Sequence, residues 1–227
     1  MRFDILTIFP EMVMNSLSES VIGRAIRAGI IEVNAINIRD FTLDKHKRTD
    51  DYPYSGGGGM IMTPQPIYDA YQSIASACEK KPHTIYLSPK GTVFNQQKAK
   101  SLLEYDHIVL LCGHYEGIDQ RVIDLIVDEE ISIGDFVLTG GELPAAMIVD
   151  SVSRMVPGVL AGEESFKNES HYDGLLEYPQ YTRPPEFMGL CVPGILLSGD
   201  HAKIEKWKHD QSVEITKRLR PDMIERS

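Results

Sequence analysis

Hydrophobic and polar positions along the first 156 residues follow two kinds of pattern, one typical of strands and one typical of helices. Short apolar runs predict strands over residues 3–9, 31–38, 84–88, 107–112 and 130–133. Between the strands, helical spacing predicts helices over residues 11–28, 67–78, 118–126 and 143–156, and another that Asn95 opens. Gly29 stands where a helix end favours glycine. This alternation indicates an α/β fold with a mostly parallel sheet.

Two later stretches change the pattern. Residues 39–66 carry no clear period, and an irregular stretch of that length is typical of a functional loop. Residues 157–187 are rich in Pro, Gly and acidic residues and are interpreted as a linker. The last forty residues return to helical spacing, which predicts a helical C-terminal part with Ile204, Trp207, Ile215 and Leu219 on one side.

The charge of the chain is unevenly distributed. Its 227 residues include 33 acidic and 23 basic side chains, for a net charge of −10. Such an excess on average disfavours a polyanionic partner, because like charges repel at long range. Residues 1–103 carry +2, residues 104–187 carry −13 and residues 188–227 carry +1. The acidity therefore belongs to one middle segment, and a nucleic-acid partner stays open for the two flanking segments.

The cysteines and the apolar runs bear on the compartment. Cys78, Cys112 and Cys191 are odd in number and far apart, which is typical of a reducing compartment and argues against structural zinc. The apolar start of the chain is broken by Asp4 and Pro10, so it does not fit a secretion signal. No eighteen apolar residues run together. We expect a cytoplasmic protein without a membrane span.

A run of four glycines lies between Tyr54 and Met60. It lacks the Gly-Lys-Ser/Thr of a P-loop, and it lacks the flanking strand and helix of a dinucleotide-binding turn. A flexible solvated turn and a backbone surface for a large planar ligand both stay open. The nearby tyrosines and the basic residues before the run favour contact with bases and phosphates. These basic residues are Lys45, His46, Lys47 and Arg48.

Three loops with small residues follow predicted strands, over residues 87–91, 113–119 and 133–141. Ligands of parallel sheets bind at the carboxyl ends of the strands. Backbone groups there can reach an adenine-like edge, and Glu116 or Asp119 can accept a hydrogen bond from a ribose hydroxyl or an ammonium. A tight turn is the simpler interpretation of any single loop. Three in series predict a nucleotide-like pocket.

Other candidates for chemistry lie near the middle of the chain. Arg154 falls opposite the apolar face of its predicted helix, where an ion pair with Asp150 and a contact with a substrate oxygen are both possible interpretations. Cys112 ends an apolar strand and is interpreted as a buried thiol, not a nucleophile. The linker holds five acids that are solvated by default but could act as a base: Glu163, Glu164, Glu169, Asp173 and Glu177.

Seven segments, in this order and spacing, cover nearly the whole chain: YSGGGGMIMTPQP, YLSPKG, CGHYEGIDQR, ISIGDFVLTGGELPA, SRMVPGVL, GLLEYPQYTRP and VPGILLSGDHAKI. Together they resemble the bacterial tRNA (guanine-N1)-methyltransferase family of the SPOUT methyltransferases. The resemblance implies an α/β fold with a deep C-terminal trefoil knot, which general rules of chain topology would have excluded. It further implies a homodimer with active sites at the subunit interface.

The resemblance also implies how the chain divides and what it does. A knotted cofactor-binding domain is expected over residues 1–160, a linker over 161–175 and a helical tRNA-binding domain over 176–227. The implied activity transfers a methyl group from S-adenosylmethionine to N1 of the guanosine immediately 3′ of the tRNA anticodon, in a guanosine-guanosine context. The family's use of Mg²⁺ suggests the same here, although no metal ligands can be named.

Site residues follow from the matching positions. The implied cofactor pocket consists of Tyr86, Leu87, Ser88, Pro89, Gly113, Tyr115, Glu116, Gly117, Ser132, Ile133, Gly134, Asp135, Phe136, Val137, Leu138, Gly140, Gly141 and Pro144. The implied guanine-reading segment contains Asp50, Gly56, Gly57, Gly58 and Gly59. We expect phosphate contacts and a shallow salt dependence from Lys45, His46, Lys47, Arg48, Lys206, Lys208, Lys217 and Arg218.

Two residues are assigned to catalysis by the resemblance. Glu169 is expected to take the N1 proton, and Arg154 to stabilise negative charge on the guanine carbonyl oxygen. Three positions depart from the family pattern: Ser55 replaces a glycine, Lys90 a glutamine, and Glu169 the catalytic aspartate. Asp173 and Asp50 are the alternative bases.

Two other functions remain as alternatives. One is a non-catalytic tRNA-binding SPOUT protein, and the other is a SPOUT methyltransferase that acts on another RNA. A Rossmann-type methyltransferase is disfavoured, because Pro10 and Glu11 follow the first strand where a glycine-rich turn would stand.

Overall fold

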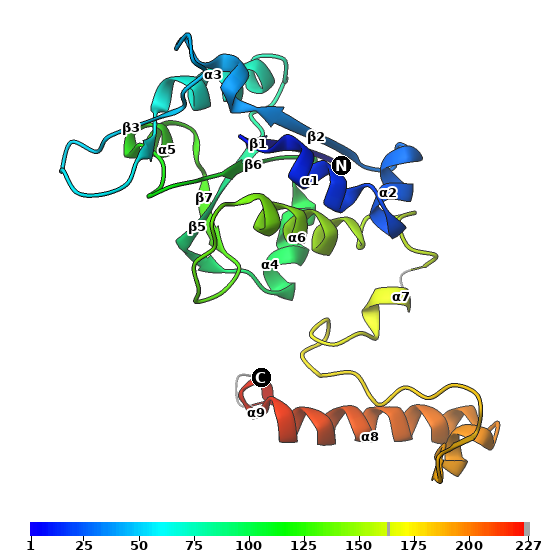
Figure 1. The fold of residues 1–227 in the computed structure, drawn as a ribbon. Coiled ribbons are helices and arrows are strands. Elements are labelled where there is room, and N and C mark those ends of the chain that lie inside the picture. Colours follow the sequence, from blue (N-terminus) through cyan, green and yellow to red (C-terminus); the bar gives the residue numbers. More distant parts are fainter. Residues whose placement is uncertain (163, 225–227) are drawn as a thin grey trace. The chain divides into compact units, whose positions relative to one another are not determined.

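The computed structural model describes residues 1–162 and 164–224. It contains two compact units, Met1–Gly162 and Glu163–Ser227, which are coloured blue to green-yellow and yellow to red in Figure 1. Each unit is described by itself below. None of the helices in the described ranges is long and apolar enough to span a membrane.

A five-stranded parallel sheet forms the centre of the first unit. Its order is β2-β1-β6-β5-β7. The strands are β1 (Arg2–Thr7), β2 (Glu32–Asn37), β5 (His83–Val93), β6 (His107–Cys112) and β7 (Glu129–Ser132). The register of β5 on β7 shifts between Leu87 and Thr92. The sheet confirms the predicted α/β fold with a mostly parallel sheet.

Helices cover both faces of this sheet (Figure 1). One face carries α1 (Pro10–Leu17), α4 (Gln96–Ser101) and α6 (Glu142–Ser153), and the other carries α3 (Pro64–Ala75) and α5 (Gln120–Ile126). The strands are buried on both faces. In β1, Phe3 and Ile5 alternate with Asp4 and Leu6, and all four are fully buried, so the strand presents no polar face to solvent. Short 3₁₀ turns, η1 (Ile38–Phe41) and η2 (Leu102–Glu104), complete the unit.

The predicted helix over residues 11–28 is in fact two helices, and that prediction was wrong. α1 ends at Leu17. The chain then bends, and α2 (Ser20–Arg27) begins at Ser20, whose φ is 56°. Arg27 donates a hydrogen bond to the carbonyl of Ser18, and that oxygen occupies the space of a Cβ on Gly23. A side chain at residue 23 would therefore block the bend. Gly29 does follow the end of α2, with a φ of 69°.

The stretch 39–66 is also more ordered than predicted. A short antiparallel pair, β3 (Asp50–Asp51) and β4 (Ile61–Met62), brackets the glycine run. The amide and hydroxyl of Thr63 both donate to the carbonyl of Thr49. Two-residue strands give too short an alternation to be recognised in a sequence.

The second unit is built around one long helix. Its elements are α7 (Glu164–Lys167), β8 (Glu186–Phe187), β9 (Leu190–Cys191), η3 (Gly194–Leu197), α8 (His201–Leu219) and α9 (Pro221–Ile224). The ring of Trp207 on α8 lies near those of Tyr178 and Tyr181. The most buried positions of α8 are Ser212 and Thr216, not the apolar side that the sequence predicted.

A hydrogen bond explains this burial. The amide of Leu176 donates to Oγ1 of Thr216 at 2.8 Å, and that hydroxyl donates to the carbonyl of Ser212. The segment interpreted as a linker is thus attached to α8 by its backbone.

Candidate active site

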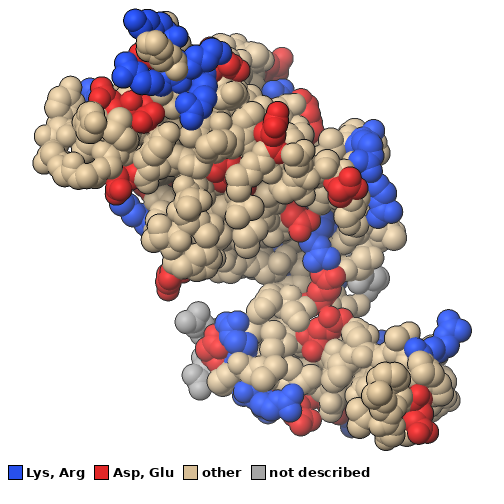
Figure 2. All heavy atoms as spheres, in the orientation of Figure 1, with Lys and Arg blue, Asp and Glu red and all other residues tan. Residues whose placement is uncertain are grey.

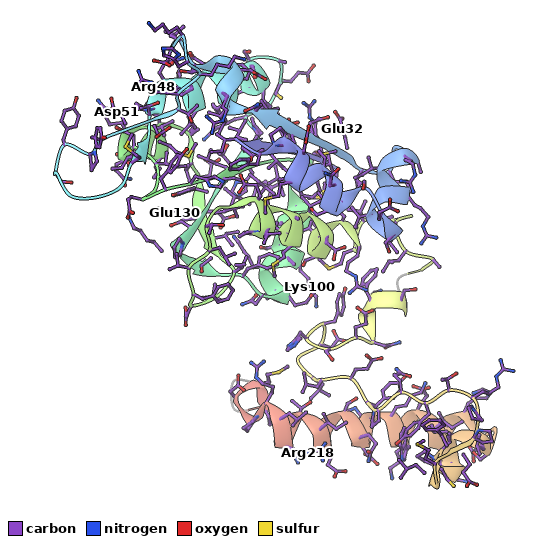
Figure 3. The ribbon with its side chains drawn as sticks, viewed as in Figure 1. Glu32, Arg48, Asp51, Lys100, Glu130 and Arg218 are labelled. Carbon is purple, nitrogen blue, oxygen red and sulfur yellow. The ribbon has the colours of Figure 1, made fainter. Side chains whose placement is uncertain are left out.

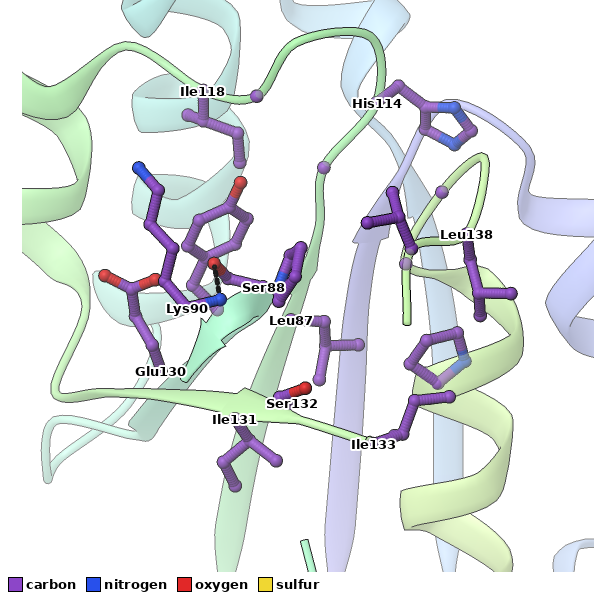
Figure 4. Close-up of a pocket in the computed structure, with 18 of the residues that line it drawn as sticks. Leu87, Ser88, Lys90, His114, Ile118, Glu130, Ile131, Ser132, Ile133 and Leu138 are labelled. Carbon is purple, nitrogen blue, oxygen red and sulfur yellow. Dashed lines mark hydrogen bonds between the residues drawn. The ribbon is translucent and has the colours of Figure 1, made fainter. Parts of the chain in front are cut away.

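A cavity of about 280 Å³ lies where β5, β6 and β7 end (Figure 4). All the predicted cofactor residues line it except Gly134 and Asp135. The sequence prediction omitted part of the lining, namely Lys90, His114, Ile118, Gln120, Ile123, Glu130, Ile131 and Thr139. In Figure 4, Lys90 and Glu130 lie on one side of the cavity, and Ile133 and Leu138 on the other. Two charged side chains of the lining therefore lie opposite two apolar ones.

Two of the predicted loops are packed closely together at this cavity. The amide of Gly141 donates to the carbonyl of Gly113 at 3.1 Å, and Gly140 forms a bridge with His114. A Cβ on Gly141 would lie 2.7 Å from Cα of Cys112. The glycines are therefore required for the two loops to approach, which is the role that small residues have in a ligand-binding loop.

A buried polar group supports the same loops. Nε2 of His114 lies 2.7 Å from Oε2 of Glu142, which is 1% exposed, and Thr7 donates a second hydrogen bond to that carboxylate. Burial works to raise the pKa of Glu142, but the hydrogen bonds from His114 and Thr7 outweigh it and hold the pKa below its usual value. Glu142 is thus a buried carboxylate that joins β1, the loop after β6 and the start of α6.

A second carboxylate with a buried oxygen, that of Glu130, lies beside Tyr86 at the cavity. The two residues are paired across β5 and β7, so their side chains lie on the same face of the sheet. Burial, and then the negative charge of Glu130, raise the pKa of Tyr86 to about 12. Oε2 of Glu130 is buried and has no hydrogen-bond partner in the described part of the chain. An unpaired buried carboxylate oxygen is costly, which favours a ligand that brings a cation or a donor.

The glycine run is joined to the cofactor loop after β6. The amide of Met62 donates to Gly117, that of Glu116 to Met60, and that of Asp119 to Met62, at 2.9–3.0 Å. A Cβ on Gly59 would lie 2.4 Å from Cγ of Glu116. Backbone hydrogen bonds therefore connect the predicted substrate-binding segment directly to the cofactor loop after β6.

Lys and Arg side chains gather at the top of the first unit in Figure 2, over the segment where Figure 3 labels Arg48. Arg48 pairs with Asp44 at 2.8 Å, and Lys47 pairs with Asp40 at 3.1 Å. Arg48 thereby holds the pKa of Asp44 well below its usual range. Within the described ranges, Lys45 has no carboxylate partner. The cluster is therefore less positive than its sequence indicates.

Arg154 lies at the far end of α6 from the cavity. The N-terminal end of α6 contributes Pro144 to the lining, and Arg154 is the C-cap of the same helix. Ten residues of helix separate them by about 15 Å. One chain therefore does not bring its own Arg154 to its own cavity.

Glu169 lies in the second unit. It lines a cavity of about 410 Å³ together with Asp173, Tyr178, Lys208 and His209. Of the other predicted acids, Glu163 lies outside the described residues. Glu177 is attached through its amide to Oγ of Ser170 at 2.9 Å. The two leading candidates for the base, Glu169 and Asp173, are thus brought together.

The predicted cations of the second unit lie on α8. Lys208 pairs with Glu205 at 2.7 Å and lies 5.2 Å from the ring centroid of Tyr178. Three of these cations have no ion pair within the described ranges: Lys206, Lys217 and Arg218. Arg218, labelled in Figure 3, lies in the last turn of α8.

Two further predicted features concern Cys112 and metal ions. Cys112 is fully buried, and burial raises the pKa of its thiol well above the ordinary value, as expected of a structural thiol. Among the residues that the structure describes, no three His, Cys, Asp or Glu side chains are grouped as a metal site requires. The described residues therefore offer no cluster that could hold Mg²⁺ by protein ligands alone.

Comparison with known proteins gives a family match over the whole chain. The sequence profile of the tRNA (guanine-1)-methyltransferases, TrmD, matches residues 1–226. The tRNA (guanine-N(1)-)-methyltransferase of Ruminiclostridium cellulolyticum is 58% identical, over 99% of this chain and 96% of the relative. That of Clostridioides difficile is 58% identical over 100% and 99%. That of Lachnospira eligens is 53% identical over 99% and 95%.

Proposed function

The chain belongs to the tRNA (guanine-1)-methyltransferase family, and we propose that it methylates N1 of the guanosine immediately 3′ of the tRNA anticodon when another guanosine precedes it. The observation that carries this proposal is the joining of the cavity to the glycine run. One segment can hold a methyl donor while the attached segment holds a base.

The cavity fits S-adenosylmethionine by the chemistry of its lining. When bound, S-adenosylmethionine supplies an electrophilic methyl group on a positively charged sulfonium. Glu116 and Glu130 provide two carboxylates for the sulfonium and the ammonium of such a ligand, and the unpartnered Oε2 of Glu130 gains a partner. Leu138 and Ile133 cover the faces of its adenine.

Glu169 removes the N1 proton in this proposal. Guanine N1 is a poor nucleophile while it carries a proton, so a carboxylate must accept that proton as the new bond forms. Arg154 donates to the carbonyl oxygen on which negative charge develops, an effect worth about 3 kcal/mol in comparable sites.

We propose a homodimer because Arg154 and the cavity lie at opposite ends of α6. A second copy could bring its Arg154 to the cavity of the first. Four apolar side chains are exposed in the single chain: Phe9, the residue before α1, Met12 on α1, and Leu143 and Met147 on α6. α1 packs on α6, and we propose that these four residues form one apolar face of the interface.

The remaining assignments follow from the family and the substrate. The loops around the cavity form the trefoil knot, and residues 176–227 form the tRNA-binding domain, joined to residues 1–160 by residues 161–175. Lys45, Lys206, Lys217 and Arg218 contact phosphates. The enzyme works in the cytoplasm, where its tRNA substrate is.

A methylation assay tests the activity. Purified protein, labelled S-adenosylmethionine and tRNA transcripts that carry guanosine or adenosine at the two positions should give label only in the guanosine-guanosine transcript. Binding of that transcript without label in the product would favour the non-catalytic tRNA-binding alternative. Label in a ribosomal RNA fragment instead would favour another RNA substrate.

A further inference from the structure

A cysteine, a histidine and an aspartate lie in line at the amino ends of β1 and β6. Sγ of Cys78 is 3.5 Å from Nδ1 of His107, and Nε2 of His107 is 2.7 Å from Oδ2 of Asp4. Asp4 is fully buried, and the His107 side chain is 16% exposed. Cys78 is half-buried. The carboxyl end of β6 borders the cofactor cavity, about 20 Å away along that strand.

The buried carboxylate determines which nitrogen of His107 carries the proton. Asp4 accepts a hydrogen bond at Oδ2 and is an acceptor only, so Nε2 of His107 is the donor. In the neutral ring this leaves a lone pair on Nδ1, which faces the sulfur of Cys78. A nucleophile, a base and a group that orients the base are thus present in the order that activates thiols elsewhere.

Other groups around the thiol are consistent with this role. Arg2 donates to Asp4 at 2.9 Å and pairs with Glu32 at 3.8 Å. Asn34 donates to the other oxygen of Asp4 at 2.9 Å. The S–H group can also donate to the carbonyl of Ile74, at 3.3 Å. The sulfur thus contacts one ring nitrogen of His107, and the carboxylate of Asp4 contacts the other.

We propose that Cys78, His107 and Asp4 form a modification site that reacts with small disulfides. The proton of the Cys78 thiol moves to Nδ1 of His107 as the sulfur attacks one sulfur of a disulfide R–S–S–R. A Cys78–S–S–R bond forms, the R–S–S–R bond breaks, and the leaving thiolate takes the proton from His107 and departs as R–SH. Cys78 is oxidised and the second half of the reagent is reduced, so no further oxidant is required.

The test measures modification of each cysteine by bis(2-hydroxyethyl) disulfide at pH 7, with peptide mass spectrometry after acid quenching. The native full-length protein is compared with the same chain in urea. An ordinary thiol reacts more slowly when folding partly covers it, whereas Cys78 should react faster in the native protein. Cys112, which is fully buried, should not react in the native protein. A native Cys78 rate at or below the rate in urea overturns the proposal.

Two variants separate the base from the fold. His107→Gln should slow the native Cys78 reaction by about tenfold, with the Cys191 rate in the same molecule as the internal reference. His83→Gln is the matched control, because His83 is also part-buried and bonded to a carboxylate, Glu129, but not to a cysteine. It should leave the Cys78 rate unchanged. An unchanged rate in a folded His107→Gln protein overturns the proposal. If that variant does not fold, the comparison of native and urea-treated wild type decides.

Discussion

Glu142 and His114 form a buried hydrogen-bonded pair, with 2.7 Å between Oε2 and Nε2, although 28 residues separate them in the chain. The pair joins the loop after β6 to the first turn of α6, and both segments line the cofactor cavity. Loss of this pair should therefore affect both the stability of the fold and the binding of the cofactor.

Glu142→Gln should lower the free energy of unfolding at pH 7 by about 2 kcal/mol, the usual range for a lost hydrogen bond to a charged group. The folded pKa of Glu142 is depressed, so its contribution is complete above the unfolded pKa of about 4.3 and is lost as the pH falls through the lower folded value. The melting temperature of the wild type should therefore drop more steeply below about pH 4.3 than that of the variant. Glu104→Gln, at an exposed acid, is the control. Parallel curves for wild type and Glu142→Gln would contradict the assignment.

Glu130→Gln should weaken binding of S-adenosylmethionine by about tenfold, because it removes a charge that faces a cationic ligand. S-adenosylhomocysteine lacks the sulfonium charge and should lose less affinity. Calorimetry of both ligands measures the difference. Glu129→Gln is the control on the neighbouring strand position, where the carboxylate pairs with His83 and Lys98. Equal losses for both ligands would place Glu130 against a group that they share.

Glu169→Gln should reduce single-turnover methylation by about a hundredfold or more, because the amide cannot accept the N1 proton. Affinity for S-adenosylmethionine should be unchanged, since Glu169 belongs to the second unit and is not among the residues that line the cofactor cavity of the first. Asp173→Asn, in the same cavity as Glu169, should retain most of the rate. The reverse result would assign the base to Asp173, and full activity of both variants would assign it to Asp50.

Met147→Glu should dissociate the proposed homodimer, because it places a charge in the exposed apolar face of α1 and α6. Turnover should fall with the dimer fraction in sedimentation experiments, while the monomer stays folded. Leu125→Glu is the matched control, since Leu125 is an exposed apolar residue on α5, on the other face of the sheet. A fully active monomeric variant would show that one chain supplies the whole site.

Lys45→Ala should weaken tRNA binding and reduce the slope of log affinity against log salt by about one. Lys47→Ala should have a smaller effect, because Lys47 already pairs with Asp40. Fluorescence anisotropy at several salt concentrations tests both variants. A larger effect of Lys47→Ala would mean that the ion pair opens when tRNA binds.

The sequence by itself determined the elements whose patterns are long and regular. The parallel strands, the helix that Asn95 caps and the loops after β6 and β7 follow from local apolar periods and turn residues, whereas the predicted loop 87–91 is part of β5. The residues alone predicted that three loops form a nucleotide-like pocket and that the glycine run contacts bases and phosphates. The individual residues of the cofactor lining were implied by the family segments.

Only the tertiary structure decided which distant side chains meet. Glu130 reaches the cavity because the register of β7 on β5 sets it beside Tyr86, and Thr7 bonds to Glu142 across 135 residues of chain. The bend between α1 and α2 depends on the close approach of a carbonyl to Gly23, and no periodic pattern in the sequence indicates this contact. Cys78, His107 and Asp4 lie on three separate segments. Local patterns specify which elements form, whereas packing and strand register specify which groups become neighbours.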